Sequence, residues 1–283
     1  MSHDESTAAR LARSLWNRAI KLGIALPITP NTRLIENRGD LAFYPVLGGD
    51  HPTKWCFPDS FDNPNCAWLQ AIKSLYAEPI SFPSSLSPDA GLLLHSLIRN
   101  LRPRIIVEVG VFISVSTHWM AAALLDAGID PAGPVIHCFD DFGPIHKMPY
   151  CESEMLEGRL EWVTQRLESA GLIDYVEFHV GDSSPNLAGA RERLIAAGGV
   201  DFAFIDGDHS IRGVTKDFVS LEPALNTGGY VLLHDTFPEQ CGMHKGPRYV
   251  CDNINKIGSG TYELCEIYLA PLNYGMALLR RIG

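Results

Sequence analysis

The chain has 283 residues, a formal net charge of −10 at pH 7 and 46% hydrophobic residues. A chain of this length can bury a full core, and it suits one large domain or one domain with an appended cap. The excess of acidic residues argues against a nucleic-acid backbone as the main partner, so we expect a small molecule. The sequence has no apolar run of roughly 18 residues and no signal-peptide pattern, which predicts a soluble cytoplasmic protein without a membrane partner.

The first part of the chain is the least regular. Residues 5–22 place apolar side chains on one face and are predicted to form an amphipathic helix, which offers a surface for a possible homo-oligomer. Residues 27–64 are dense in Pro, Gly, Asn and Asp, and a further helix is expected at 67–76. We therefore predict a helical and irregular N-terminal cap over residues 1–86 and a main domain over residues 87–283.

The main domain alternates between two kinds of hydrophobic pattern. Ser87 is expected to begin a helix that ends before Pro103. Strands are predicted at 104–109, 135–139, 175–180, 200–205 and 230–233. Helices are predicted between them at 116–127, 152–170 and 186–197, and in the stretch that carries Val214, Phe218, Leu221 and Leu225. In that last stretch, Gly228 and Gly229 are expected to stop the helix and to turn the chain into the next strand.

The C-terminal part changes the pattern. A helix at 249–257 precedes two expected strands at 262–269 and 274–280, which read as an antiparallel hairpin. Strands that alternate with helices make a parallel sheet covered on both faces. The predicted fold is therefore α/β, with a doubly wound, mostly parallel, seven-stranded sheet and an antiparallel C-terminal hairpin.

Acidic side chains follow two strands of this sheet. Asp206 ends the strand at 200–205, and His234 and Asp235 end the strand at 230–233. A crossover of this length makes the two strands parallel and usually adjacent, about 4.8 Å apart. The three side chains could then converge on one cation or substrate at the carboxyl edge of the sheet. The alternative is that the two Asp residues only cap loops and helices.

The stretch VEVGVFISVST, with Glu108, Gly110 and Ser116, resembles the E-x-G-x-x-x-G-x-S turn of class I S-adenosylmethionine (SAM)-dependent methyltransferases. The spacing of CFDD, of VGDS and of FIDGDHS with GGYVLLHDT is similar to the same superfamily. More narrowly, the last pair resembles the metal-dependent small-molecule O-methyltransferases that include the macrocin and mycinamicin sugar methyltransferases. The likeness covers residues 87–283. Ser114 departs from it, because the family has its second glycine there, and we interpret the serine as tuning the pocket.

The resemblance implies a SAM site. Its candidate residues are Glu108, Gly110, Ser114, Ser116, Asp140, Asp182 and Asp206. Gly110 would let the backbone approach the cofactor, and the helix near Ser116 would direct its amides at the methionine carboxylate. Asp140 would accept hydrogen bonds from the ribose hydroxyls, with Asp141 as the alternative, and Asp182 would face the adenine amino group. The Asp140–Asp141 pair could instead be a turn former.

The resemblance also implies methyl transfer to a hydroxyl group. Asp206, His234 and Asp235 are the candidate ligands of a divalent cation, Mg or Mn, although imidazole suits Mn, Fe or Zn better than Mg. His209 is the candidate general base, because histidine titrates near neutral pH, and Asp208 is its rival. We expect the acceptor to be a small hydroxylated molecule such as a sugar or a secondary metabolite.

Other functions fit part of the pattern. The chain could be a metal-independent N- or O-methyltransferase with His209 and Asp208 as base and orienting residue. It could also bind the cofactor without transferring methyl, and Ser114 is the residue that suggests this. A nicotinamide-dependent dehydrogenase is disfavoured, because the chain reads GVFISV where that class has GxGxxG. The acceptor is expected to contact residues 1–86 and the loops at 142–150 and 237–248.

Overall fold

The structure is a computed structural model. It describes residues 54–57, 63–133, 135–147, 153–238, 241, 244–267 and 274–283. The amphipathic helix predicted at 5–22 lies outside these residues, as does most of the irregular stretch at 27–64.

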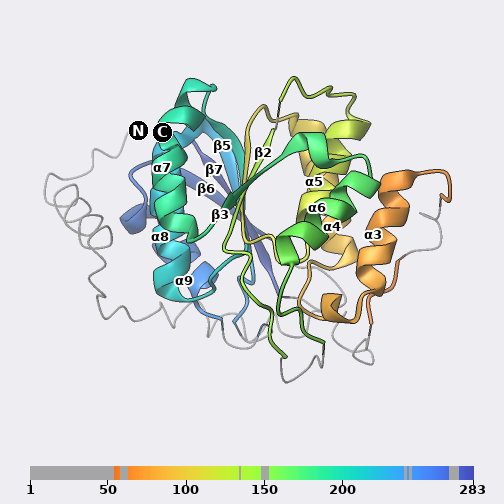
Figure 1. The fold of residues 1–283 in the computed structure, drawn as a ribbon. Coiled ribbons are helices and arrows are strands. Elements are labelled where there is room, and N and C mark those ends of the chain that lie inside the picture. Colours follow the sequence, from red (N-terminus) through yellow and green to blue (C-terminus); the bar gives the residue numbers. More distant parts are fainter. Residues whose placement is uncertain are drawn as a thin grey trace, which may run out of the picture.

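A seven-stranded sheet in the order β3-β2-β1-β4-β5-β7-β6 forms the centre of the molecule (Figure 1). Strands β1 to β5 run parallel, and β7 is antiparallel to both β5 and β6. The strands are β1 Ile106–Val109, β2 Ile136–Asp140, β3 Val176–Val180, β4 Val200–Ile205, β5 Leu225–His234, β6 Tyr262–Ile267 and β7 Met276–Arg281. The predicted fold is confirmed, including the antiparallel hairpin at the C-terminal end.

Helices cover both faces of the sheet. Figure 1 shows α4, α5 and α6 on one side with α3 outside them, and α7, α8 and α9 on the other side. The helices are α3 Ala67–Ala77, α4 Pro88–Leu101, α5 Val115–Asp126, α6 Arg159–Ser169, α7 Ser183–Ala196, α8 Ile211–Leu221 and α9 Gly246–Ile257. Three-residue 3₁₀ turns occur at Pro79–Ser81, Ile173–Tyr175 and Glu222–Ala224. None of the described helices is long and apolar enough to cross a membrane.

Each face of the sheet has its own apolar core. Ile106 and Val107, consecutive in β1, are fully buried on opposite faces, because side chains alternate along a strand. Ile106 packs in the core that contains Trp119 of α5, and Val107 packs in the core that contains Phe218 of α8. A strand buried on both faces needs apolar residues at successive positions, which explains the almost uninterrupted apolar run that identified β1.

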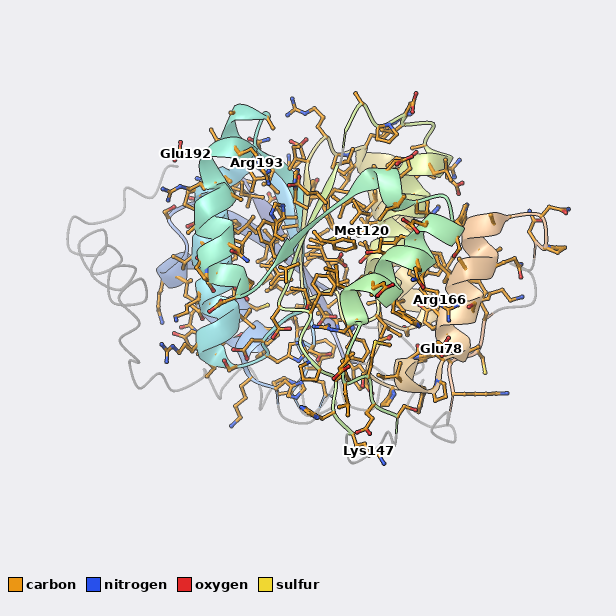
Figure 2. All side chains as sticks on the ribbon, in the orientation of Figure 1. Glu78, Met120, Lys147, Arg166, Glu192 and Arg193 are labelled. Atoms are coloured by element: carbon orange, nitrogen blue, oxygen red, sulfur yellow. The ribbon has the colours of Figure 1, made fainter. Side chains whose placement is uncertain are left out.

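The segment that precedes the main domain shares its core. Ile72 and Leu75 of α3 are fully buried in the cluster that contains Trp119. Arg166 of α6 also binds Glu78, at the end of α3, with 2.6 Å between Nη2 and Oε1 (Figure 2). The part of residues 54–86 that the structure describes is therefore packed against the sheet domain. The domain boundary at residue 86 stays a prediction.

The helix expected at 152–170 begins only at Arg159. Its first half was predicted wrongly: Ile145 and Met155 form an antiparallel bridge, and Gly158 occupies the left-handed region at φ 71°. The apolar side chain of Leu156 matched the helical spacing, but it is 49% exposed. Leu156 matched the helical spacing by chance, because residues 153–158 are not helical.

The role predicted for Gly228 and Gly229 was also wrong. Both lie inside β5, which begins at Leu225, the residue expected to end the preceding helix. The register between β4 and β5 shifts between Val200 and Phe202, opposite these glycines. Gly228 has φ 87°, so the pair permits a local irregularity within a long strand rather than a turn between elements.

Candidate active site

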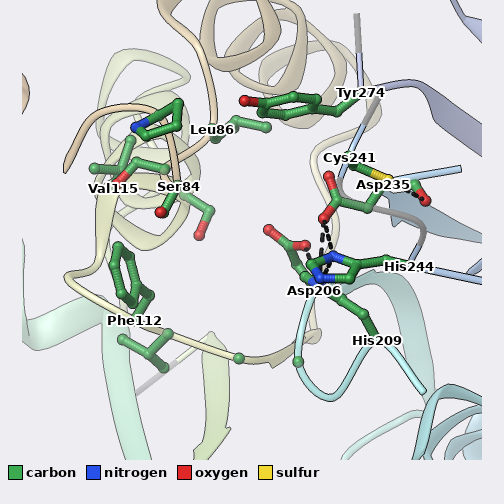
Figure 3. Close-up of a pocket in the computed structure, with 16 residues that line it drawn as sticks. Ser84, Leu86, Phe112, Val115, Asp206, His209, Asp235, Cys241, His244 and Tyr274 are labelled. Carbon is green, nitrogen blue, oxygen red and sulfur yellow. Dashed lines mark hydrogen bonds and ion pairs between the residues drawn. The ribbon is translucent and has the colours of Figure 1, made fainter. Parts of the chain in front are cut away.

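A cavity of about 580 Å³ opens at the carboxyl ends of β1, β4 and β5 (Figure 3). The sheet order reverses between β1 and β4, and open α/β sheets bind ligands at this switch point. One wall carries Gly110, Val111 and Phe112 after β1 and Val115 and Ser116 from α5. The opposite wall carries Asp206, Gly207, His209, Asp235, Cys241, His244 and Tyr274. Residues Pro83, Ser84, Ser85 and Leu86, which precede α4, complete the lining.

Gly110 has φ +88°, a conformation that residues with a side chain rarely adopt. A Cβ atom at this position would lie 2.3 Å from the carbonyl oxygen of Asp206 and 2.7 Å from Cα of Gly207. Glycine is therefore required for the close packing of the turn after β1 against the turn after β4. This contact holds the turn that begins one wall of the cavity against the turn that begins the other.

Glu108 lies away from the cavity. Its carboxylate is fully buried and accepts hydrogen bonds from the hydroxyls of Ser116 and Thr117, both at 2.6 Å, and from the Cys138 thiol at 3.0 Å. Burial raises the pKa of Glu108 to about 7, against the opposing effect of these hydrogen bonds. Glu108 thus fixes the first turn of α5 to β1 and positions Ser116, which does line the cavity.

Ser114 takes the left-handed conformation, with φ 67° and ψ 22°. Glycine adopts this conformation at the least cost in free energy, which explains why the methyltransferase motif that the sequence resembles has glycine at this position. The side chain of Ser114 is fully buried and its hydroxyl donates to the carbonyl oxygen of Ile113 at 2.5 Å. It does not line the cavity, so nothing in its position crowds a ligand there.

The carboxylate of Asp140, at the end of β2, binds other groups of the protein. It accepts hydrogen bonds from the backbone amides of Val111 at 2.7 Å and Phe112 at 3.2 Å. Arg159, the first residue of α6, places Nη2 2.5 Å from Asp140 Oδ1 and 2.9 Å from Asp141 Oδ1. Asp140 therefore anchors the turn at Gly110, and the side chain of Asp141 is 72% exposed. The predicted ribose contact of Asp140 stays a prediction.

Two other candidates accept hydrogen bonds from residues close in the chain. Asp182 precedes α7 and accepts a hydrogen bond from the Ser184 amide at 3.2 Å. Asp208 accepts from the Ser210 amide at 2.8 Å and from the Ser210 hydroxyl at 2.9 Å. Neither residue lines the cavity. The roles predicted for them, contact with the adenine amino group for Asp182 and proton acceptance as the rival of His209 for Asp208, stay predictions.

The remaining candidates form one cluster at the cavity wall. His209 places Nε2 3.0 Å from Asp206 Oδ1 and Nδ1 3.3 Å from Asp235 Oδ2. His234 places Nδ1 3.2 Å from Asp206 Oδ1 and 3.1 Å from Asp235 Oδ1. His244 completes the cluster, with Nδ1 3.0 Å from Nδ1 of His209 and 3.4 Å from Asp235 Oδ2. The expected convergence of the two strand ends is present.

The charges within the cluster stabilise one another. Burial acts to lower the pKa of His234, but the neighbouring charges of Asp206 and Asp235 outweigh it and raise that pKa well above its ordinary value. The pKa of His209 is also raised, because its hydrogen bond to Asp206 and the two carboxylate charges exceed the effect of burial. Conversely, the positive charge of His234 lowers the pKa of Asp206 and Asp235 against the effect of burial. Both carboxylates are therefore ionised at neutral pH.

Asp235 also has an unusual backbone. Its φ of 56° lies in the left-handed region, which residues other than glycine seldom occupy. Such conformations cost free energy and persist where the surrounding structure imposes them, most often at functional sites. Here the conformation follows directly on β5, whose end aligns with that of β4 through the pair Ile205 and Leu233.

Sequence reasoning missed three contributors to this site. Thr117 is the second hydroxyl on Glu108, and Arg159 is the partner of Asp140. His244 belongs to the loop at 237–248 that was expected to contact the acceptor, but it was not among the predicted site residues, and it joins the cluster. The only sequence signal for His244 was its place in the loop that follows Asp235, and spacing along the chain does not show which way a loop folds.

Known proteins resemble this domain in sequence pattern and in fold. Residues 107–236 match a family model described as a methyltransferase domain. The O-methyltransferase TomG from Streptomyces achromogenes, involved in tomaymycin synthesis and solved with SAM, superposes with a TM-score of 0.56 at 20% identity, covering 79% of this chain and 92% of TomG. An O-methyltransferase from Bacillus cereus in complex with S-adenosylhomocysteine (SAH) gives 0.56 at 17% identity, with 78% and 94% covered. The SAH-bound Podospora anserina methyltransferase PaMTH1 gives 0.53 at 14%, with 91% and 98% covered.

These likenesses establish the fold, and residues 107–236 match the methyltransferase domain model. The predicted enzyme class, a methyltransferase, is confirmed. The narrower resemblance to the macrocin and mycinamicin type, and the dependence on a metal, stay predictions.

Proposed function

We propose that the chain is a SAM-dependent O-methyltransferase that acts on a small hydroxylated molecule, such as a sugar or a secondary metabolite, with the help of a divalent cation. One observation carries this proposal. A single cavity is lined both by the Gly110 turn with Ser116, where the sequence predicts the methyl donor, and by Asp206, His209 and Asp235. A donor and an acceptor bound there would meet, and the net charge of −10 favours a small acceptor over a nucleic acid.

The donor half of the proposal rests on the turn after β1. The N-terminus of α5 adjoins the cavity at Val115 and Ser116, and helix N-termini favour anionic groups such as the methionine carboxylate. The methyltransferase TomG and the Bacillus cereus enzyme, which share this fold, were solved with SAM and SAH. Neither Asp140 nor Asp182 lines the cavity, so the cofactor would have to extend past it to reach them. The side chain of Asp141 is more exposed than that of Asp140, and Asp141 is therefore an alternative partner for the ribose.

Methyl transfer to a hydroxyl is an in-line displacement. The oxygen forms a bond to the methyl carbon as the carbon–sulfur bond breaks, and SAH leaves as a neutral thioether. The main tasks of the protein are to align the two reactants and to remove the hydroxyl proton. His209 lines the cavity, and its Nε2 lies 3.0 Å from Asp206 Oδ1, which leaves Nδ1 as the other ring nitrogen (Figure 3). A lone pair in this position can accept the proton or bind a cation.

The cluster also fits a divalent cation. Asp206, Asp235, His209, His234 and His244 supply carboxylate oxygens and imidazole nitrogens within reach of one another, in two overlapping groups of three. A bound cation would polarise the acceptor hydroxyl and lower its pKa. The residues themselves would hold the acceptor oxygen close to the donor and exclude other nucleophiles.

The first test is calorimetry of SAM and SAH with the full chain, followed by mass spectrometry for SAH in the presence of panels of sugars and phenols. We expect SAM to bind at one site per chain and SAH to accumulate only with certain hydroxylated acceptors. Asp235→Asn should bind SAM and fail to turn it over. Failure of the wild-type chain to bind SAM would refute the proposal.

Two outcomes would point to the competing functions. Turnover that persists unchanged after dialysis against a chelator would indicate a metal-independent methyltransferase. SAM binding without SAH formation across all acceptor classes, amines included, would indicate a protein that binds the cofactor without transferring methyl.

A further inference from the structure

The cavity wall holds three potential ligand atoms in a nearly equilateral triangle. Nδ1 of His209 and Nδ1 of His244 are 3.0 Å apart, and Oδ2 of Asp235 lies 3.3 Å from the first and 3.4 Å from the second. Ligands bound at about 2.1 Å from one cation, with angles between octahedral and tetrahedral values, are about 3.0 to 3.4 Å apart. The three distances fall in this range. All three residues line the cavity (Figure 3).

The hydrogen bonding of His209 directs its lone pair toward this triangle. The carboxylate of Asp206 can only accept, so Nε2 of His209, 3.0 Å away, carries the proton of the neutral ring. Nδ1 is then the ring nitrogen that can offer a lone pair, and it lies 3.0 Å from Nδ1 of His244 and 3.3 Å from Oδ2 of Asp235. A proton can bridge only two of the three atoms, whereas a cation can bind all three.

We infer that His209, Asp235 and His244 are the ligands of a first-row transition-metal dication, with Asp206 orienting His209 from behind. This inference deepens the proposed function and rests on it for the role of the metal. It differs from the predicted set of Asp206, His234 and Asp235. A carboxylate that accepts the second N–H of a ligating histidine is the usual outer partner in such sites.

The predicted set is the weaker candidate because of access. His234 is 6% exposed and does not line the cavity, so a cation on its Nδ1 would be closed off from an acceptor. By contrast, the side chain of His244 is 44% exposed, and His209, Asp235 and His244 all line the cavity. Three ligands on one side of the cation leave positions for the acceptor oxygen.

The donor set also selects the metal. Two imidazole nitrogens and one carboxylate suit Zn, Co, Fe or Mn, whereas Mg prefers oxygen ligands and octahedral geometry. We therefore expect Zn and Co to bind this site and Mg to bind poorly, in contrast to the Mg that the sequence resemblance suggested.

A second group of potential ligands provides the control. His137, Glu177 and His179 lie together on β2 and β3, outside the cavity. The guanidinium of Arg193 is 2.9 Å from Glu177 Oε1 and 3.2 Å from His179 Nε2, and this positive charge disfavours a cation there. His179→Ala should therefore leave metal binding unchanged.

The experiment uses the full chain, stripped with a chelator and desalted, without SAM. Zn and Mg are titrated by calorimetry, and Co is followed by its visible ligand-field spectrum. We expect one Zn or Co per chain, with an affinity at least about tenfold higher than for Mg. His244→Ala, which alters a half-exposed side chain, should weaken Zn binding by roughly 100-fold or more and change the Co spectrum. Asp206→Asn should weaken it by about 10- to 100-fold, as outer partners do.

The inference fails if His244→Ala leaves the Zn affinity and the Co spectrum unchanged, if Mg binds as tightly as Zn, or if His179→Ala abolishes binding. Its failure differs from that of the proposed function. A chain that binds no Zn, and that binds and turns over SAM in the presence of a chelator, would refute the metal site and the role of the cation but leave methyl transfer standing. A chain that binds one Zn through His244 and never binds SAM would refute the methyltransferase proposal alone.

Discussion

Nε2 of His209 lies 3.0 Å from Oδ1 of Asp206, three positions earlier in the chain. The pair spans the turn between β4 and α8, so the end of a strand fixes the ring that faces the cavity. Asp206 itself is held in place by the packing of its backbone against Gly110. The geometry of the reactive cluster therefore depends on the turn that is expected to bind the methyl donor.

Gly110→Ala tests this dependence. The new Cβ would meet the Asp206 carbonyl at 2.3 Å in a left-handed conformation, so we expect a loss of roughly 3 kcal/mol or more in unfolding free energy and loss of SAM binding. Gly228→Ala is the matched control, because Gly228 has φ +87° and nothing lies within 4 Å of a Cβ there. It should cost only about 1 kcal/mol. Equal losses in urea denaturation would contradict the packing role of Gly110.

Ser114→Gly tests whether the serine tunes the donor pocket. Ser114 is buried outside the cavity in a conformation that glycine adopts more easily, so we expect stability within about 1 kcal/mol of wild type. The Kd for SAM should change by less than about threefold, because no contact with the cavity is lost. Calorimetry with SAM measures this directly. A tenfold change in Kd would restore the interpretation that the serine shapes the cofactor site.

Asp140→Asn and Asp141→Asn separate anchoring from cofactor contact. The Asp140 carboxylate binds two backbone amides and the buried Arg159, so its substitution should lower the unfolding free energy by roughly 2–4 kcal/mol. Asp141 is 72% exposed, and its substitution should cost less than about 1 kcal/mol.

The SAM affinity of the same two variants completes the comparison. If Asp141 contacts the ribose, Asp141→Asn should weaken SAM binding while the denaturation midpoint stays at the wild-type value. An Asp140→Asn variant that is fully stable but binds SAM poorly would instead assign the ribose contact to Asp140.

Glu108 should make stability depend on pH. Burial raises its folded-state pKa from 4.5 to about 7, so the folded state binds the proton more tightly than the unfolded state does. The contribution of this group to stability is therefore fully present below about pH 4.5 and is lost as the pH rises through about 7. One pKa unit corresponds to about 1.4 kcal/mol, which makes the total change roughly 3 kcal/mol at most.

Glu108→Gln removes this titration. We expect the difference in unfolding free energy between wild type and variant to favour wild type more at pH 5 than at pH 8. Urea denaturation at both values measures it. A difference that stays constant within about 0.5 kcal/mol would mean that the pKa of Glu108 is not raised.

Local patterns along the chain determined the order of the strands and helices and the edge at which the site lies. Residues 200–205 and 230–233 are largely apolar runs, followed by Asp206 and by His234 and Asp235, and a crossover of helical length makes such strands parallel neighbours. These features depend on nearby residues only, so Asp206, His209 and Asp235 could be placed together from the sequence. The same reasoning failed for Leu156, where an apolar residue matched the helical period but points to solvent.

The tertiary structure determined which polar atoms have hydrogen-bond partners within the protein. Glu108 and Asp140 are acidic residues at the right strand positions, yet their carboxylates are taken by Ser116, Thr117 and Arg159. His244 joined the cluster although it lies nine residues beyond Asp235, and no periodicity encodes that contact. Hydrogen-bond partners distant in sequence are chosen by the packed fold as a whole, so the sequence by itself determined the edge of the sheet, and only the folded chain determined which side chains meet there.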